Sequence, residues 1–177
     1  MPKFMNSLPT AMAAFLSLSA VIVGFDLWTK AYAVAALQTE GVTYPVIADF
    51  FSFTLRYNHG AAFSFLYDAG GWQRWFFAII AAAMSVVLTV WLSRIATKKR
   101  LESLGLALIL GGALGNLYDR VTLGYVVDFI DFYYQQYHFP AFNIADCGIT
   151  CGAALLIWDA MFGANHKTQT AGEPAND

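Results

Sequence analysis

The chain has 177 residues, of which 58% are hydrophobic and 12% are charged. Soluble domains of this size carry about 25% charged residues, so the composition favours an integral membrane protein, and the length suits one domain. The formal net charge of −2 gives no reason to expect a nucleic-acid partner.

Four apolar segments can cross a membrane, because a spanning helix needs about 20 mostly apolar residues. They are 11–36, 75–92, 101–117 and 144–162. The first could instead be a cleaved signal peptide, since Lys3 precedes its apolar run and Ala31–Ala33 resembles a cleavage site. Against this, Asp26 and Lys30 interrupt the run and share a helix face at i, i+4. We expect a span in which this pair is either an interfacial salt bridge or a support for a site.

The longest stretch outside the spans is 38–73. Within it, 42–47 and 51–57 are rich in β-branched and aromatic residues, which predicts short strands. Asn58–Gly60 is a turn signal, and we expect His59 to be a solvated loop residue and not a metal ligand. The following apolar segment, 61–66, is too short to cross and is flanked by aromatic residues. This pattern is typical of an element lying at the membrane interface.

The densest basic cluster, Arg94–Arg100, follows the second span directly in a short loop. By the positive-inside rule this loop is cytoplasmic. Four crossings then place both termini in the cytoplasm, with six Lys and Arg residues inside and four outside. A single membrane domain would occupy 1–163, and the polar tail 164–177 is expected to be disordered and cytoplasmic.

Small residues recur at i, i+4 in the last two spans. The pairs Gly111/Gly115 and Gly148/Gly152 predict close packing of the third span against the fourth. Cys147 and Cys151 have the same spacing, and we interpret them as small apolar core residues.

The predicted topology brings several polar side chains to one depth, the outer membrane surface. They are Asp26, Asn116, Asp119, Asp128, Asn143 and Asp146. Asn116 shares a helix face with Asp119 and Arg120, and Asn143 shares one with Asp146. Ionisable groups in or near a span are costly and by default indicate function.

Three interpretations of these acids stay open. They could cap helix ends and pair with Arg120 and Lys30. Two of them could form a hydrolytic dyad, because one of two adjacent carboxylates holds a proton while the other stays ionised. They could also form a cation or proton site in a non-enzymatic protein. For a dyad, Asp119 and Asp131 are as admissible as Asp128. No HExxH, P-loop or GxGxxG is present, so no metal or cofactor is expected.

Five motifs in order resemble the bacterial lipoprotein signal peptidases, also called signal peptidase II. They are FDLWTK (25–30), YNHGAAFSF (57–65), GGALGNLYDR (111–120), GYVVDF (124–129) and FNIAD (142–146). The resemblance implies a multi-pass aspartic endopeptidase of the bacterial inner membrane whose active site faces the periplasm. We expect the protein to be a monomer. Its substrates would be diacylglyceryl prolipoproteins embedded in membrane lipid, cut just before the lipidated cysteine.

The resemblance also implies the roles of individual residues. Asp128 and Asp146 match the family's catalytic aspartates. The positions that match substrate-binding or supporting residues are Asp26, Lys30, Asn58, Gly60, Asn116, Asp119, Arg120 and Asn143. By the same resemblance, Asp119 beside Arg120 is held ionised for structure or substrate positioning. The implied fold is an all-α membrane protein with four transmembrane helices, a small periplasmic β-sheet and an interfacial helix, the last two within 38–73.

Overall fold

The computed structural model describes residues 7–60 and 71–162. Its four helices are α1 (Leu8–Leu37), α2 (Trp72–Ile95), α3 (Arg100–Thr122) and α4 (Ile144–Phe162). Each is long and apolar enough to span a membrane, which confirms the four predicted helices. The first three extend past their predicted ends, because helical hydrogen bonding continues beyond the point where hydropathy falls. The predicted interfacial element at 61–66 and the tail at 164–177 lie outside the described residues.

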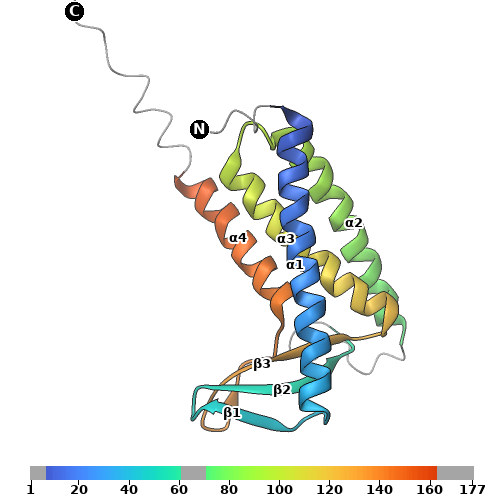
Figure 1. Cartoon of the computed structure of the whole chain (residues 1–177), viewed down its shortest axis with the longest axis vertical. Coiled ribbons are helices and arrows are strands. Elements are labelled where there is room, and N and C mark those ends of the chain that lie inside the picture. The colour runs from blue at the N-terminus through green and yellow to red at the C-terminus, as the bar shows by residue number, and fades with distance from the viewer. Residues whose placement is uncertain (1–6, 61–70, 163–177) are drawn as a thin grey trace, which may run out of the picture.

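The central helix of the bundle is α3, which packs against α1, α2 and α4 (Figure 1). In its most apolar window 56% of the residues are buried, compared with 17–22% in the other three helices. Large apolar side chains such as Trp28, Ile79 and Ile157 are instead exposed on the outer helices. Lipid would cover such a surface, so the bundle is built for a bilayer.

Glycines on α3 allow the neighbouring helices to approach it closely. One of the predicted glycines, Gly111, faces a different helix from the one expected. A Cβ at Gly111 would lie 2.8 Å from Cβ of Ile22, so this glycine faces α1 and not α4. Contact with α4 is made by Gly112, where a Cβ would clash with the carbonyl oxygen of Ala145, and by Gly105 against Gly152. The prediction for Gly111 was wrong because α3 is central and has close neighbours on several faces.

A four-stranded antiparallel sheet in the order β1-β2-β3-β4 lies at one end of the bundle (Figure 1). The strands are β1 (Thr43–Ile47), β2 (Phe51–Asn58), β3 (Val126–Tyr134) and β4 (Tyr137–His138). The first two confirm the predicted strands, whereas β3 and β4 are additional. Residues 126–129 of β3 are all buried, so the strand lacks the alternation of a half-buried strand. That strand carries Asp128.

The turn from α3 into β3 directs Asp128 back towards α4. Gly124 adopts φ +92°, which glycine accepts readily, and its N–H donates to the carbonyl oxygen of Asp119 at 3.2 Å. Arg74 of α2 donates to the carbonyl oxygens of Arg120 and Val121 at 2.7 and 2.5 Å. These bonds satisfy the open end of α3 and fix where β3 begins.

Candidate active site

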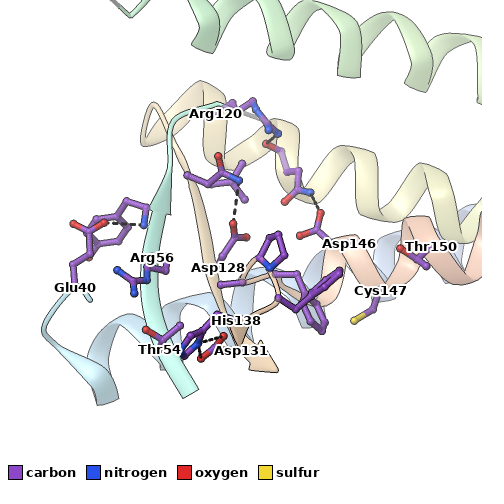
Figure 2. A pocket seen from close by; sticks show the side chains of 18 of the residues that line it. Glu40, Thr54, Arg56, Arg120, Asp128, Asp131, His138, Asp146, Cys147 and Thr150 are labelled. Atoms are coloured by element: carbon purple, nitrogen blue, oxygen red, sulfur yellow. Dashed lines mark hydrogen bonds and ion pairs between the residues drawn. The ribbon is translucent and has the colours of Figure 1, made fainter. Parts of the chain in front are cut away.

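A cleft of about 960 Å³ lies where the sheet meets α3 and α4 (Figure 2). Five of the residues predicted from the sequence line it: Asn58, Asn116, Arg120, Asp128 and Asp146. They come from β2, α3, β3 and α4, so the fold brings together side chains that are distant in the chain. The other predicted residues with side chains, Asp26, Lys30, Asp119 and Asn143, are buried and are not among the cleft-lining residues.

Asp128 is 3% exposed and accepts two amide hydrogen bonds. Asn143 Nδ2 donates to its Oδ1 at 2.7 Å, and Asn58 Nδ2 donates to its Oδ2 at 3.2 Å. Burial, helped by the negative charge of Asp146, raises the pKa of Asp128 to about 7, while the two amide donors act in the opposite direction. A carboxyl with this pKa can both hold and release a proton near neutral pH.

Asp146 lies in the first turn of α4, where Asn143 caps the helix. The Asp146 N–H donates to Oδ1 of Asn143 at 3.0 Å, and the Asn143 N–H donates to Oδ2 of Asp146 at 3.2 Å. This reciprocal pair has the form of a capping box and holds the carboxylate at the helix N-terminus. Its other oxygen, Oδ1, accepts a hydrogen bond from Asn116 Nδ2 at 2.8 Å. Two asparagines therefore orient Asp146 towards the cleft.

Behind the two cleft aspartates, a buried ion cluster joins α1 to α3. Lys30 Nζ lies 2.7 Å from Asp26 Oδ2 and 2.9 Å from Asp119 Oδ2. Asp26 Oδ1 accepts the N–H of Ala145 at 2.8 Å, and Asp119 Oδ2 accepts the N–H of Val127 at 3.1 Å. Asp26 therefore binds the start of α4 and Asp119 binds β3, and within the described ranges both pair with Lys30 and not with Arg120.

Arg120 connects α3 to the turn after β2. Its Nη1 donates to the carbonyl oxygen of Asn116 and its Nη2 to that of Gly60, both at 3.3 Å. Gly60 N–H in turn donates to Oδ1 of Asn58 at 3.1 Å, which orients that side chain's amide towards Asp128. Among the described residues Arg120 forms no salt bridge with an acid. Arg120 also lines the cleft, and two of its five N–H donors are used in these two contacts.

Asp131, the other candidate partner in a dyad, also lines the cleft, but its carboxylate already contacts two other side chains. Its Oδ2 accepts a hydrogen bond from Ser52 Oγ at 2.7 Å and lies 2.9 Å from Nδ1 of His138. Figure 2 shows this pair away from Asp128, at the lower end of the cleft. Neither the Ser52 nor the His138 contact is predicted from the sequence, because both depend on the pairing of β3 with β2 and β4.

The cleft has further lining residues that the sequence does not point to. Glu40 and Arg56 line its sheet side, and Cys147 and Cys151 line its α4 side together with Thr150 (Figure 2). The cysteines were predicted to be core residues, but Cys151 is exposed and Cys147 is half-buried. The prediction was wrong because α4 lies at the edge of the bundle. His59 is half-buried and packs its ring on Tyr125, with centroids 5.4 Å apart, so it is not fully solvated.

Solved structures with the same fold are bacterial membrane enzymes. One, described as a bacterial membrane enzyme structure at 2.3 Å resolution, has a TM-score of 0.74 and 32% identity, and the match covers 93% of this chain and 94% of that one. A second, at 1.9 Å resolution, has a TM-score of 0.72 and 34% identity over 85% of this chain and 94% of the other.

Sequence relatives agree with the structural match. Residues 18–162 match the family described as signal peptidase (SPase) II. The lipoprotein signal peptidase of Teredinibacter turnerae is 62% identical over 117 residues, which are 66% of this chain and 70% of the relative. That of Pseudomonas syringae pv. tomato is 52% identical over 165 residues, 93% of this chain and 92% of the relative. The chain belongs to the signal peptidase II family.

Proposed function

We propose that this membrane protease cuts diacylglyceryl-modified prolipoproteins just before the lipidated cysteine, with Asp128 and Asp146 as its acid–base pair. One observation supports this pair. Among the described residues, Asp128 and Asp146 form no ion pair, whereas Asp131 lies 2.9 Å from Nδ1 of His138, which carries a charge only when it is protonated. Asp119 does not line the cleft and pairs with Lys30. Membership in a protease family also removes the non-enzymatic cation or proton site from consideration.

The chemistry follows from one proton shared by two carboxyls. The ionised aspartate takes a proton from a water molecule, whose oxygen attacks the carbonyl carbon of the scissile peptide bond. The protonated aspartate donates its proton to the carbonyl oxygen. When the tetrahedral intermediate collapses, the C–N bond breaks and the aspartate that took the proton from water passes it to the leaving amine of the cysteine. The other aspartate regains its proton from a hydroxyl group of the intermediate. A pKa of about 7 for Asp128 suits a group that holds the proton at the start of this cycle.

Backbone recognition is assigned to the polar side chains around the dyad. Arg120 has a planar set of five donors, of which two already bind carbonyl oxygens of the protein. The others can donate to carbonyl oxygens of an extended substrate, which a lysine cannot do with the same geometry. Asn58 and Asn116 hold the two aspartates, so their first role is to orient the dyad.

The two sides of the cleft suit the two parts of the substrate. From Asp146 the lining continues along α4 through Cys147, Thr150 and Cys151, towards the apolar middle of the bundle. In our proposal the acyl chains lie on this side, within the outer leaflet, and the polar chain after the cysteine leaves over the sheet past Arg56. A monomer in the inner membrane, with the sheet in the periplasm, can then cut the bond without drawing lipid into water.

The substrate assignment is tested with purified protein and one prolipoprotein prepared with and without its diacylglyceryl group. We expect cleavage of the lipidated form only, with the lipidated cysteine as the new N-terminus by mass spectrometry. The rate should be the same with and without EDTA. Equal cleavage of the unlipidated form, or loss of cleavage in EDTA, would contradict the proposal.

A further inference from the structure

Lys30 has an unusual position for a lysine: its side chain is almost completely buried between α1 and α3, with 3% of the residue exposed. Its ammonium forms ion pairs with Asp26 Oδ2 at 2.7 Å and with Asp119 Oδ2 at 2.9 Å. It also donates a hydrogen bond to the amide oxygen Oδ1 of Asn116 at 3.0 Å. Lys30 does not line the cleft, so it does not touch a substrate bound there.

We infer that Lys30 is a positioning residue that fixes the side-chain amide of Asn116 with its NH₂ group towards Asp146. This inference rests on the proposed role of the dyad. The ammonium can only donate, so it requires the oxygen of Asn116. The opposite end of the same amide must then present its N–H to Asp146 Oδ1, 2.8 Å away. A rotated amide would set NH₂ against NH₃⁺ and an oxygen against a carboxylate.

A second donor supports this orientation without replacing Lys30. Asn143 Nδ2 donates to the same oxygen of Asn116, at 3.2 Å, and also to Asp128 Oδ1 at 2.7 Å and the carbonyl oxygen of Val127 at 3.2 Å. This amide nitrogen is shared among three acceptors, and it is neutral. A charge-assisted donor is roughly twice as strong as a neutral one. The ammonium is therefore the main determinant of how Asn116 is oriented.

The two carboxylates that balance Lys30 also connect it to both segments of the dyad. Asp26 accepts the N–H of Ala145, next to Asp146, and Asp119 accepts the N–H of Val127, next to Asp128. One buried ammonium thus joins α1 and α3 to the start of α4 and to β3. Loss of the ammonium would therefore loosen the positions of Asp128 and Asp146, and not only the orientation of Asn116.

Removing the ammonium also changes the charge around the dyad. The charged groups that act on Asp128 include Asp146 on α4, Lys30 on α1 and Arg120 on α3, and Arg56 lies opposite it on β2. Without Lys30 the ionised dyad loses a nearby positive charge and an oriented N–H donor. Protonation of the dyad then becomes easier, so the acidic limb of the pH–rate profile should move to higher pH.

The test compares Lys30→Met with wild type in the full-length protein, using a lipidated prolipoprotein. Because a hydrogen bond to a charged group is lost, we expect kcat to fall between about 10-fold and 100-fold. KM should stay within about threefold, since Lys30 makes no substrate contact. The acidic limb should move up by about one pH unit. Lys99→Met removes an exposed lysine, also paired with an acid, and should leave both kcat and the limb unchanged.

Lys30→Met leaves two buried carboxylates without a cation, which is strongly destabilising. The double variant Lys30→Met/Asp26→Asn therefore runs beside it, because it removes one charge of each sign. Thermal unfolding in detergent identifies the variants that fold. A folded variant of either kind with wild-type kcat and an unmoved acidic limb would overturn the inference.

Asp128→Asn, measured in the same series, separates this inference from the proposed function. If Asp128→Asn cleaves substrate, the dyad proposal fails. If it is inactive while a folded Lys30 variant behaves as wild type, only the role of Lys30 fails.

Discussion

Asp128 illustrates how a single side chain acquires a functional pKa from its surroundings. It is buried on β3, is close enough to Asp146 to be affected by its charge, and within residues 7–60 and 71–162 accepts hydrogen bonds from two neutral amides. Its pKa in the folded state, about 7, is above the ordinary value of 3.8. Between these values the folded state binds the proton more tightly than the unfolded state does. The resulting stability is complete below pH 4 and is lost as pH rises through 7.

The first prediction follows from this loss of stability as the pH rises. The gap between 3.8 and about 7 corresponds to roughly 4 kcal/mol of stability lost by wild type at high pH. Asp128→Asn cannot ionise, so its melting temperature relative to wild type should be higher at pH 8 than at pH 5. Thermal unfolding in detergent measures this. Asp49→Asn, at an exposed turn, is the control and should keep the wild-type pH dependence. The same difference for Asp128→Asn at both pH values would contradict the prediction.

At the level of residues, the sequence could identify the group of acids but not the dyad within it. Asp119 lies in the last turn of α3, and Asp128 and Asp131 follow it in β3, so the sequence places all three near the same end of that helix and hydropathy cannot separate them. What distinguishes the three aspartates is the side chain that each one contacts. Asp119 pairs with Lys30, Asp131 with His138, and Asp128 with two asparagines. Those contacts depend on strand pairing, which is not local in the sequence.

At the level of elements, the close approach of α1 to α3 determines whether Asp26 can enter the bundle. A Cβ added at Gly115 would lie 2.6 Å from Asp26 Oδ2 and 3.4 Å from Cβ of Ala145. Asp26 is fully buried and accepts the N–H of Ala145 at the start of α4. An extra methyl group here would therefore displace a charge that both joins α1 to α4 and balances Lys30.

The second prediction uses two glycine-to-alanine changes. Gly115→Ala should lower stability by about 1–3 kcal/mol through overpacking. It should also lower cleavage, because it displaces Asp26. Gly24→Ala adds the same methyl group on α1 where no atom lies within 4 Å, and helix propensity favours alanine by up to about 1 kcal/mol. Melting temperatures and cleavage rates of the pair check this. Equal behaviour of the two variants would be the contrary result.

The elements also show why one part of the fold could be predicted and another could not. The helices follow from long apolar runs, and β1 and β2 from β-branched and aromatic residues. In β3, Val126 to Phe129 are all buried, and acids interrupt the apolar run. Such a segment lacks the period-2 pattern that identifies a half-buried strand. The position of Asp128 opposite Arg56 of β2 was therefore available only from the structure.

At the scale of the whole molecule, the sheet and a basic cluster lie at opposite ends of the bundle. α1 begins, and α4 ends, at the end of the bundle away from the sheet, where the short connection from α2 to α3 also lies (Figure 1). That connection contains Lys98 and Lys99, with Arg94 and Arg100 beside it. The basic cluster and the cleft are therefore at opposite ends of the bundle, separated by the length of its helices (Figure 1).

The third prediction is that the basic cluster faces the cytoplasm and the sheet faces the periplasm. A reporter that is active only in the periplasm should be active when fused after residues 50 and 130, and inactive after residues 97 and 170. Activity of the fusion after residue 97 would show the opposite orientation and would place the cleft on the wrong side for this substrate.

The central claim is that Asp128 and Asp146 act as a unit. Asn at either position keeps the shape but removes the titratable group. Asp128→Asn and Asp146→Asn should therefore each lose at least about 10³-fold in kcat, while the double variant should be little worse, because residues acting as a unit are not additive. Asp131→Asn, a change of the same type in the same cleft, should keep most of the activity.

The most direct measurement is the single-turnover rate of lipidated prolipoprotein cleavage by these four variants, each first shown to be folded and to bind substrate. We expect near-complete loss of cleavage in both single variants and in the double variant, with Asp131→Asn close to wild type. Cleavage by Asp128→Asn or Asp146→Asn at a rate near that of wild type would contradict the assignment of these two aspartates as the dyad.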